Sequence, residues 1–105
     1  VLHNQDRFEE AIYYYNKALA LKPDFAEVID NLGCIFFLQG KLKIAEEYHR
    51  RAIKIKPDWQ WPYLNLGLTL QDQWKLSESE DSYKKALIIN PRWGDVYINL
   101  GSVQL

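Results

Sequence analysis

The chain has 105 residues, of which 48% are hydrophobic and 26% charged, and its formal net charge is -1. This length suits one globular unit with its own core. The near-neutral charge argues against nucleic-acid binding through phosphate contacts. No apolar run approaches the roughly 18 residues that a membrane span needs, so we expect no membrane insertion. The single cysteine, Cys34, cannot form an internal disulfide and favours a reducing compartment, cytoplasmic or nuclear.

Hydrophobic periodicity predicts a chain made only of helices. In chain order, we expect helices near residues 8–21, 26–39, 42–55, 60–73, 76–89 and 94–105. Asp6 and Glu9 are spaced for a reciprocal cap at the start of the first. A proline follows the first, third and fifth helices, and it disfavours helical geometry in the residue before it. These prolines therefore divide the chain into pairs of helices.

A spacing of 34 residues recurs along the chain. It separates Pro23, Pro57 and Pro91, and it also relates glycine, leucine, alanine and asparagine positions, which marks a repeat protein. We divide the array into a partial repeat 1–25, repeats 26–59 and 60–93, and the first helix of a further repeat, 94–105. Because the chain starts at Val1 and has no methionine, we expect it to be a piece of a longer protein.

Each repeat carries a glycine inside its first helix, at positions 33, 67 and 101. Such a glycine costs about 1 kcal/mol relative to alanine, so its recurrence needs a compensating contact. We expect the paired second helix to approach closely there, through alanines such as Ala45 and Ala52.

These positions resemble the tetratricopeptide repeat family, whose signature has an aromatic residue, Leu-Gly, a second aromatic, small residues and a closing proline. In the 60–93 repeat the signature is carried by Tyr63, Leu66, Gly67, Ser79, Tyr83, Ala86 and Pro91. Ile29 and His49 replace aromatic residues in the preceding repeat. The resemblance implies an all-α, right-handed superhelical solenoid of antiparallel helix pairs. It also implies that the first helices line a concave groove that holds peptides or partner proteins.

The repeat allows the tryptophans to be compared with their equivalents. Trp59 corresponds to Phe25 and Trp93, so we interpret it as a packing residue. Trp61 corresponds to an acidic residue in both other repeats, so the scaffold does not require an aromatic side chain there. We therefore expect Trp61→Ala to weaken binding with little change in stability, and Trp59→Ala to do the reverse.

At about 100° per residue, the first helices present a second face opposite the signature residues. Contiguous exposed apolar residues usually indicate binding, although several of these residues could instead pack between neighbouring first helices. The predicted peptide-binding groove comprises Glu27, Asp30, Asn31, Cys34, Phe37, Leu38, Trp61, Leu64, Asn65, Leu68, Asp72, Asp95, Ile98, Asn99 and Ser102.

An asparagine precedes each Leu-Gly pair, at positions 31, 65 and 99. An asparagine amide both donates and accepts hydrogen bonds, so a row of them can pair with the main chain of an extended peptide. The row resembles the asparagine ladder in the repeat superhelix of O-linked N-acetylglucosamine transferases. The alternative is that these amides satisfy backbone groups between helices.

The predicted first helices contain no lysine or arginine. Some tetratricopeptide repeat modules hold a C-terminal carboxylate with basic residues in the groove, but the corresponding positions here are Asp30, Trp61, Asp95 and Asn99. We therefore expect a neutral or basic protein or peptide partner, rather than one recognised by its C-terminal carboxylate.

Neither His3 nor His49 is at a metal-ligand spacing from Cys34, and no glycine-rich phosphate loop occurs. We therefore expect no catalytic residues, metal or cofactor. Three functions remain open. The first is an interaction scaffold, and the second is the substrate-selecting arm of a larger enzyme such as a protein glycosyltransferase. The third is a self-association module joined end to end, because the terminal repeats are incomplete.

Overall fold

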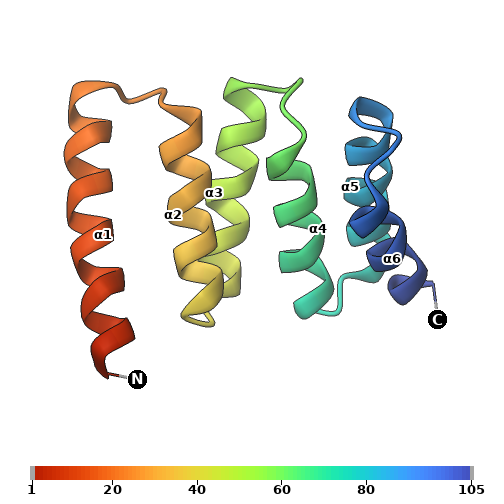
Figure 1. The fold of residues 1–105 in the computed structure, drawn as a ribbon, viewed down its shortest axis with the longest axis horizontal. Coiled ribbons are helices and arrows are strands. Elements are labelled where there is room, and N and C mark those ends of the chain that lie inside the picture. The colour runs from red at the N-terminus through yellow and green to blue at the C-terminus, as the bar shows by residue number, and fades with distance from the viewer. Residues whose placement is uncertain (1, 105) are drawn as a thin grey trace.

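The computed structural model describes residues 2–104, with side chains described from Arg7 to Gln104. Within that range it has six helices and no strand: α1 (Leu2–Leu21), α2 (Ala26–Leu38), α3 (Leu42–Ile55), α4 (Trp61–Asp72), α5 (Leu76–Ile89) and α6 (Gly94–Val103). The helices run alternately up and down in one row from α1 to α6 (Figure 1). The predicted all-α repeat solenoid is confirmed. None of the described helices combines the length and hydrophobicity that crossing a membrane requires.

The start of the first helix differs from the prediction. α1 begins at Leu2 instead of near residue 8, so Asp6 lies inside the helix and does not begin it. The physical reason is that residues 2–10 contain no glycine or proline to interrupt the helix. The Asp6 side chain, and with it the predicted cap, lies outside the part of the chain whose side chains are described.

The turns inside the two complete repeats share one backbone geometry. At Gly40 and Trp74 the backbone is left-handed, with φ of 78° and 62°. In each turn, the backbone N–H of the left-handed residue donates to the carbonyl oxygen three residues earlier. The N–H of the following lysine donates to the carbonyl oxygen five residues earlier, from Lys41 to Phe36 at 2.9 Å and from Lys75 to Leu70 at 3.0 Å. These bonds form a Schellman motif, which reverses the chain between α2 and α3 and between α4 and α5.

A ring on the second helix fills the space above each glycine of the complete repeats. A Cβ built on Gly33 would lie 2.6 Å from the His49 ring, and one built on Gly67 would overlap the Tyr83 ring even more closely. Both rings are almost completely buried. The predicted close approach is present, but the nearest atoms belong to these rings and not to the alanines. Ala45, Ala52 and Ala86 are nevertheless fully buried in the same seams.

The core continues between repeats through aromatic residues of the first helices. Tyr63 packs with Tyr83 and Val96 in one cluster, and its hydroxyl donates to Pro57 O at 2.7 Å. The equivalent Tyr97 donates to Pro91 O at 2.9 Å. Each hydroxyl thereby fixes its first helix to the turn that precedes it. Burial raises the pKa of Tyr83 to about 12, so this phenol stays neutral over the physiological range.

Alanine substitutions at two equivalent glycines should have opposite effects on stability. Gly67→Ala should lower the free energy of unfolding by about 1–3 kcal/mol, because the rigid Tyr83 ring must move, and Gly67→Leu should lower it further. Gly101 is the matched control because a Cβ there meets nothing within 4 Å. Gly101→Ala should therefore stabilise the protein by roughly 0.5–1 kcal/mol through helix propensity. Chemical denaturation measures both, and a stabilised Gly67→Ala variant would show that the crossing is not close.

The two left-handed positions supply a second comparison. A Cβ on Gly40 meets nothing within 4 Å, so Gly40→Ala should destabilise by about 1 kcal/mol through backbone geometry alone. Trp74 is 83% exposed, so Trp74→Gly removes little packing and should stabilise by about 1 kcal/mol, since left-handed geometry costs a non-glycine residue roughly 1–2 kcal/mol. Thermal unfolding of the two variants tests this, and a lower melting temperature for Trp74→Gly would contradict it.

Candidate binding face

The first helices of successive repeats lie closer together than the second helices. The backbone of α2 approaches that of α4, and the backbone of α4 approaches that of α6, whereas among the described residues the backbone of α3 approaches neither α1 nor α5. Side chains do reach from α3 to α5, as in the ion pair of Arg50 with Glu78. The row therefore curves with α2, α4 and α6 on its inner side. We call the inner surface of these three helices the first-helix face. It is the surface on which the sequence places the groove.

The structure distributes the predicted groove residues over three degrees of exposure. The exposed residues are Glu27, Asn31, Leu38, Trp61, Asp72, Asp95, Ile98 and Ser102. The half-buried residues are Cys34, Phe37, Asn65, Leu68 and Asn99. The buried residues are Asp30 and Leu64.

For two residues the prediction of an accessible groove side chain is wrong. Leu64 belongs to the core cluster with Tyr63 and Tyr83. Asp30 is 3% exposed, and both of its carboxylate oxygens are engaged inside the protein. Neither side chain is free to meet a ligand. The reason is that the fifth residue of each repeat faces the neighbouring first helix as well as the groove. A projection of one helix shows the direction of a side chain but not whether a neighbouring helix buries it.

Asp30 joins three helices through hydrogen bonds that the sequence did not predict. The Nδ1 of His49 on α3 donates to Asp30 Oδ1 at 2.7 Å, and Nδ2 of Asn65 on α4 donates to Asp30 Oδ2 at 2.9 Å. A buried polar group needs such partners to offset its loss of water. A signal was present in the sequence, because Asp30 and His49 both depart from their equivalents, Leu64 and Tyr83, within the same repeat.

A pocket of about 210 Å³ opens on the first-helix face between α2 and α4. Its lining residues are Cys34, Phe37, Leu38, His49, Asn65, Leu68 and Thr69. Burial, and secondarily the charge of Asp30, raises the pKa of the Cys34 thiol to about 11. The thiol is therefore protonated at neutral pH, where it acts as a small apolar group and not as a nucleophile.

The two tryptophans of the Trp59–Trp61 segment are both partly covered. Trp59 is half-buried, and the Lys56 ammonium lies 5.1 Å from the centre of its ring. Trp61 is 47% exposed, and it makes an edge-to-face contact with Trp93 at a centroid distance of 4.9 Å. Trp61 therefore also contributes to packing within the 60–93 repeat, against its last residue, which the comparison of repeats did not predict. We expect its loss to lower stability by about 0.5–1.5 kcal/mol.

Acidic residues at the edges of the face differ in how far they are neutralised. Glu27 pairs with Lys56 at 3.1 Å, and a backbone hydrogen bond, with this ammonium second, holds the pKa of Glu27 below its usual value. Asp72 at the end of α4 and Asp95 in the first turn of α6 are exposed. α2 and α4 have no basic residue in their last turns, and the nearest basic residues, Lys41 and Lys75, follow in the connecting turns. Lys75 is paired with Glu46 at 3.2 Å.

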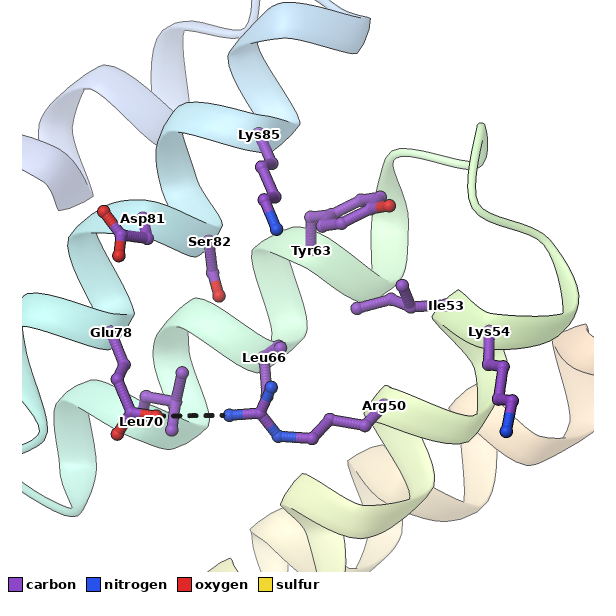
Figure 2. Close-up of a pocket in the computed structure, with 10 residues that line it drawn as sticks. All are labelled: Arg50, Ile53, Lys54, Tyr63, Leu66, Leu70, Glu78, Asp81, Ser82 and Lys85. Atoms are coloured by element: carbon purple, nitrogen blue, oxygen red, sulfur yellow. Dashed lines mark ion pairs between the residues drawn. The ribbon is translucent and has the colours of Figure 1, made fainter.

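A second hollow, of about 320 Å³, lies between α3, α4 and α5, away from the first-helix face (Figure 2). Its charges are of both signs: Arg50 reaches across to Glu78 at 3.6 Å and bonds Glu46 at 3.0 Å, and Lys54, Asp81 and Lys85 also line it. Ser82, whose hydroxyl points into the hollow in Figure 2, is 6% exposed. Because opposite charges alternate here, the hollow offers no single charge sign for a ligand to match.

The chain resembles known proteins in both sequence and fold. A family model described as "TPR repeat" matches residues 1–40, and one described as "Tetratricopeptide repeat" matches residues 25–56 and 63–90. No curated protein sequence matched the chain.

Two solved structures share the fold. The first TPR of Spaghetti (RPAP3), bound to the HSP90 peptide SRMEEVD, superposes with a TM-score of 0.90 at 22% identity, over 97% of this chain and 81% of that one. The structure of MamA superposes with a TM-score of 0.86 at 24% identity, over 96% of this chain and 59% of that one. The matched sequence models and the shared architecture agree, and the chain belongs to the tetratricopeptide repeat family.

Proposed function

We propose that this protein is an interaction scaffold that binds an extended peptide segment of a partner along its first-helix face. The observation that carries the proposal is that each of three successive first helices has an accessible apolar side chain: Leu38 on α2, Trp61 on α4 and Ile98 on α6. Phe37 and Leu68 line one pocket with Leu38 and extend this apolar surface from α2 to α4, and apolar surface that is contiguous across elements usually indicates binding. Tetratricopeptide repeats are in general non-catalytic protein-interaction modules, and the RPAP3 repeat structure holds a peptide.

The charge of the face favours a neutral or basic segment. α2, α4 and α6 contain no lysine or arginine, whereas Asp72 and Asp95 are exposed. The peptide bound by the RPAP3 repeat, SRMEEVD, is acidic. An acidic peptide would meet like charge on this face, so we propose a partner of the opposite character.

The asparagine row supports main-chain recognition only in part. Asn31 is exposed, but Asn65 donates its amide to Asp30. We therefore place the main-chain contact mainly at Asn31 and Asn99. The role of a substrate-selecting arm in a larger enzyme, such as a protein glycosyltransferase, remains the alternative, and it would use the same row. The sequence of the parent protein decides between the two, because the alternative requires a catalytic domain.

A selection with random peptides tests the proposal. Short random peptides displayed between fixed flanking segments, so that neither terminus is free, should yield binders to the 105-residue chain. Trp61→Ala should weaken a selected peptide by 2 kcal/mol or more, roughly thirtyfold. Trp59→Ala should lower stability by about 2 kcal/mol, below the roughly 3–5 kcal/mol of a fully buried tryptophan, with binding unchanged. Failure to enrich any peptide would contradict the proposal.

Self-association is a second candidate function, favoured by the open surface of α6. Tyr97 is 52% exposed where its equivalent Tyr63 is 9% exposed, and the space above Gly101 is empty where Tyr83 fills that above Gly67. We propose that the surface of a second helix, such as α1 of another copy, covers it. We expect the sedimentation coefficient to rise towards millimolar protein and Tyr97→Asp to abolish the rise. A monomer at all concentrations would contradict this candidate.

A further inference from the structure

The pocket between α2 and α4 presents an apolar surface to a ligand, although three of its lining residues are polar. His49 and Asn65 both donate to Asp30, and the Thr69 hydroxyl donates to the backbone O of Asn65 at 2.8 Å. These hydrogen bonds lie within the protein. What remains towards the opening is the neutral Cys34 thiol together with Phe37, Leu38 and Leu68. A ligand group with no polar atoms would therefore leave these hydrogen bonds intact.

The size of the pocket limits what can occupy it. Pockets for cofactors and drug-sized ligands are usually about 300–1,000 Å³, and this one is about 210 Å³. It opens on the first-helix face, on the α2 side of Trp61, where the proposed peptide would pass. A single side chain hanging from an extended peptide matches both the volume and the position.

The surroundings of the opening favour positive charge. Asp72 lies one helical turn beyond Leu68, at the end of α4, and it is exposed. The C-terminal ends of α2 and α4 lie at the same edge (Figure 1), and neither has a basic residue in its last turn. Their helix dipoles add to the negative potential of Asp72 at this edge. Lys41 and Lys75, which follow the two helices, offset it in part, and Lys75 is itself paired with Glu46.

We propose that this pocket is a specificity site that takes one large apolar side chain, of leucine, isoleucine, methionine or phenylalanine, from a peptide that carries a neighbouring lysine or arginine. The inference rests on the proposed function, because the same face must hold the peptide. It goes further in assigning which side chain is read and by which residues. Cys34 and Leu68 form the wall that sets the size of the accepted side chain, and the Asp30–His49–Asn65 hydrogen bonds hold the floor.

The repeat supplies a matched pair of variants for the test. Cys34, Leu68 and Ser102 occupy equivalent positions, and the fold already accepts leucine at the middle one. Cys34→Leu should partly fill the pocket. Ser77→Leu places the same side chain at an exposed position of α5, outside the pocket and away from the first-helix face, and serves as the control. Thermal unfolding of both variants establishes that they are folded before binding is measured.

The experiment uses peptides selected from the random displayed library against the parent chain. We expect the selected sequences to share a large apolar residue next to a lysine or arginine. Cys34→Leu should weaken such a peptide by about tenfold or more, as removal of a well-fitted hydrophobic contact does. Ser77→Leu should bind it as the parent does. Replacing the shared apolar residue of the peptide by alanine should give a similar loss with the parent, and little further loss with Cys34→Leu.

The failure of this inference is distinguishable from failure of the proposed function. Peptides that bind without a shared apolar position, or whose binding is unchanged in Cys34→Leu, would overturn the pocket assignment and leave the scaffold function standing. A library that yields no binder at all would overturn both. If Cys34→Leu does not fold, the alanine series on the peptide decides alone, since it leaves the protein unaltered.

Discussion

The packing of a ring on the second helix against a glycine on the first determines how closely each pair of helices can approach. Gly67 admits Tyr83 and Gly33 admits His49, at distances that leave no room for a methyl group. The close seams bury the alanines on α3 and α5 and fix the direction in which each first helix presents its other side. The binding face is therefore a consequence of this contact: because the signature residues of α2 and α4 are committed to the second helices, the remaining side chains line the inner surface.

One exchange in this seam changes the chemistry of the face. In the 60–93 repeat the ring is Tyr83, whose hydroxyl donates to Gln71 at 2.8 Å. In the 26–59 repeat an imidazole takes the same place and bonds Asp30 instead. The carboxylate is thereby drawn inwards and reaches Asn65 on the next repeat. The imidazole also lines the pocket between α2 and α4, and the two repeats are joined by a hydrogen-bonded bridge.

Most of the fold could be predicted from the sequence because the 34-residue spacing presents the same signals more than once. The bounds of α2 to α6 lie within two residues of the expected ones. The start of α1 was predicted wrongly because Asp6 and Glu9 have the spacing of a helix cap, whereas no glycine or proline in residues 2–10 interrupts the helix there. The site was harder to predict, because burial of Asp30 and Leu64 depends on how neighbouring first helices meet. The contact between Trp61 and Trp93 joins the two ends of the 60–93 repeat, and the comparison of equivalent positions does not reveal it.

The pattern of contacts between helices makes α4 the helix that joins the two halves of the molecule. Among the described residues, the backbones of α1 to α3 do not come close to those of α5 and α6, and side chains such as Arg50 and Glu78 bridge the two groups. The two groups can therefore tilt about α4 in the manner of a hinge, at the expense of side-chain contacts such as this ion pair. A peptide bound across α2, α4 and α6 would span this hinge on its inner side and contact both groups at once. Binding of a peptide to the inner surface would then restrict motion in the entire array, including second helices that the peptide does not contact.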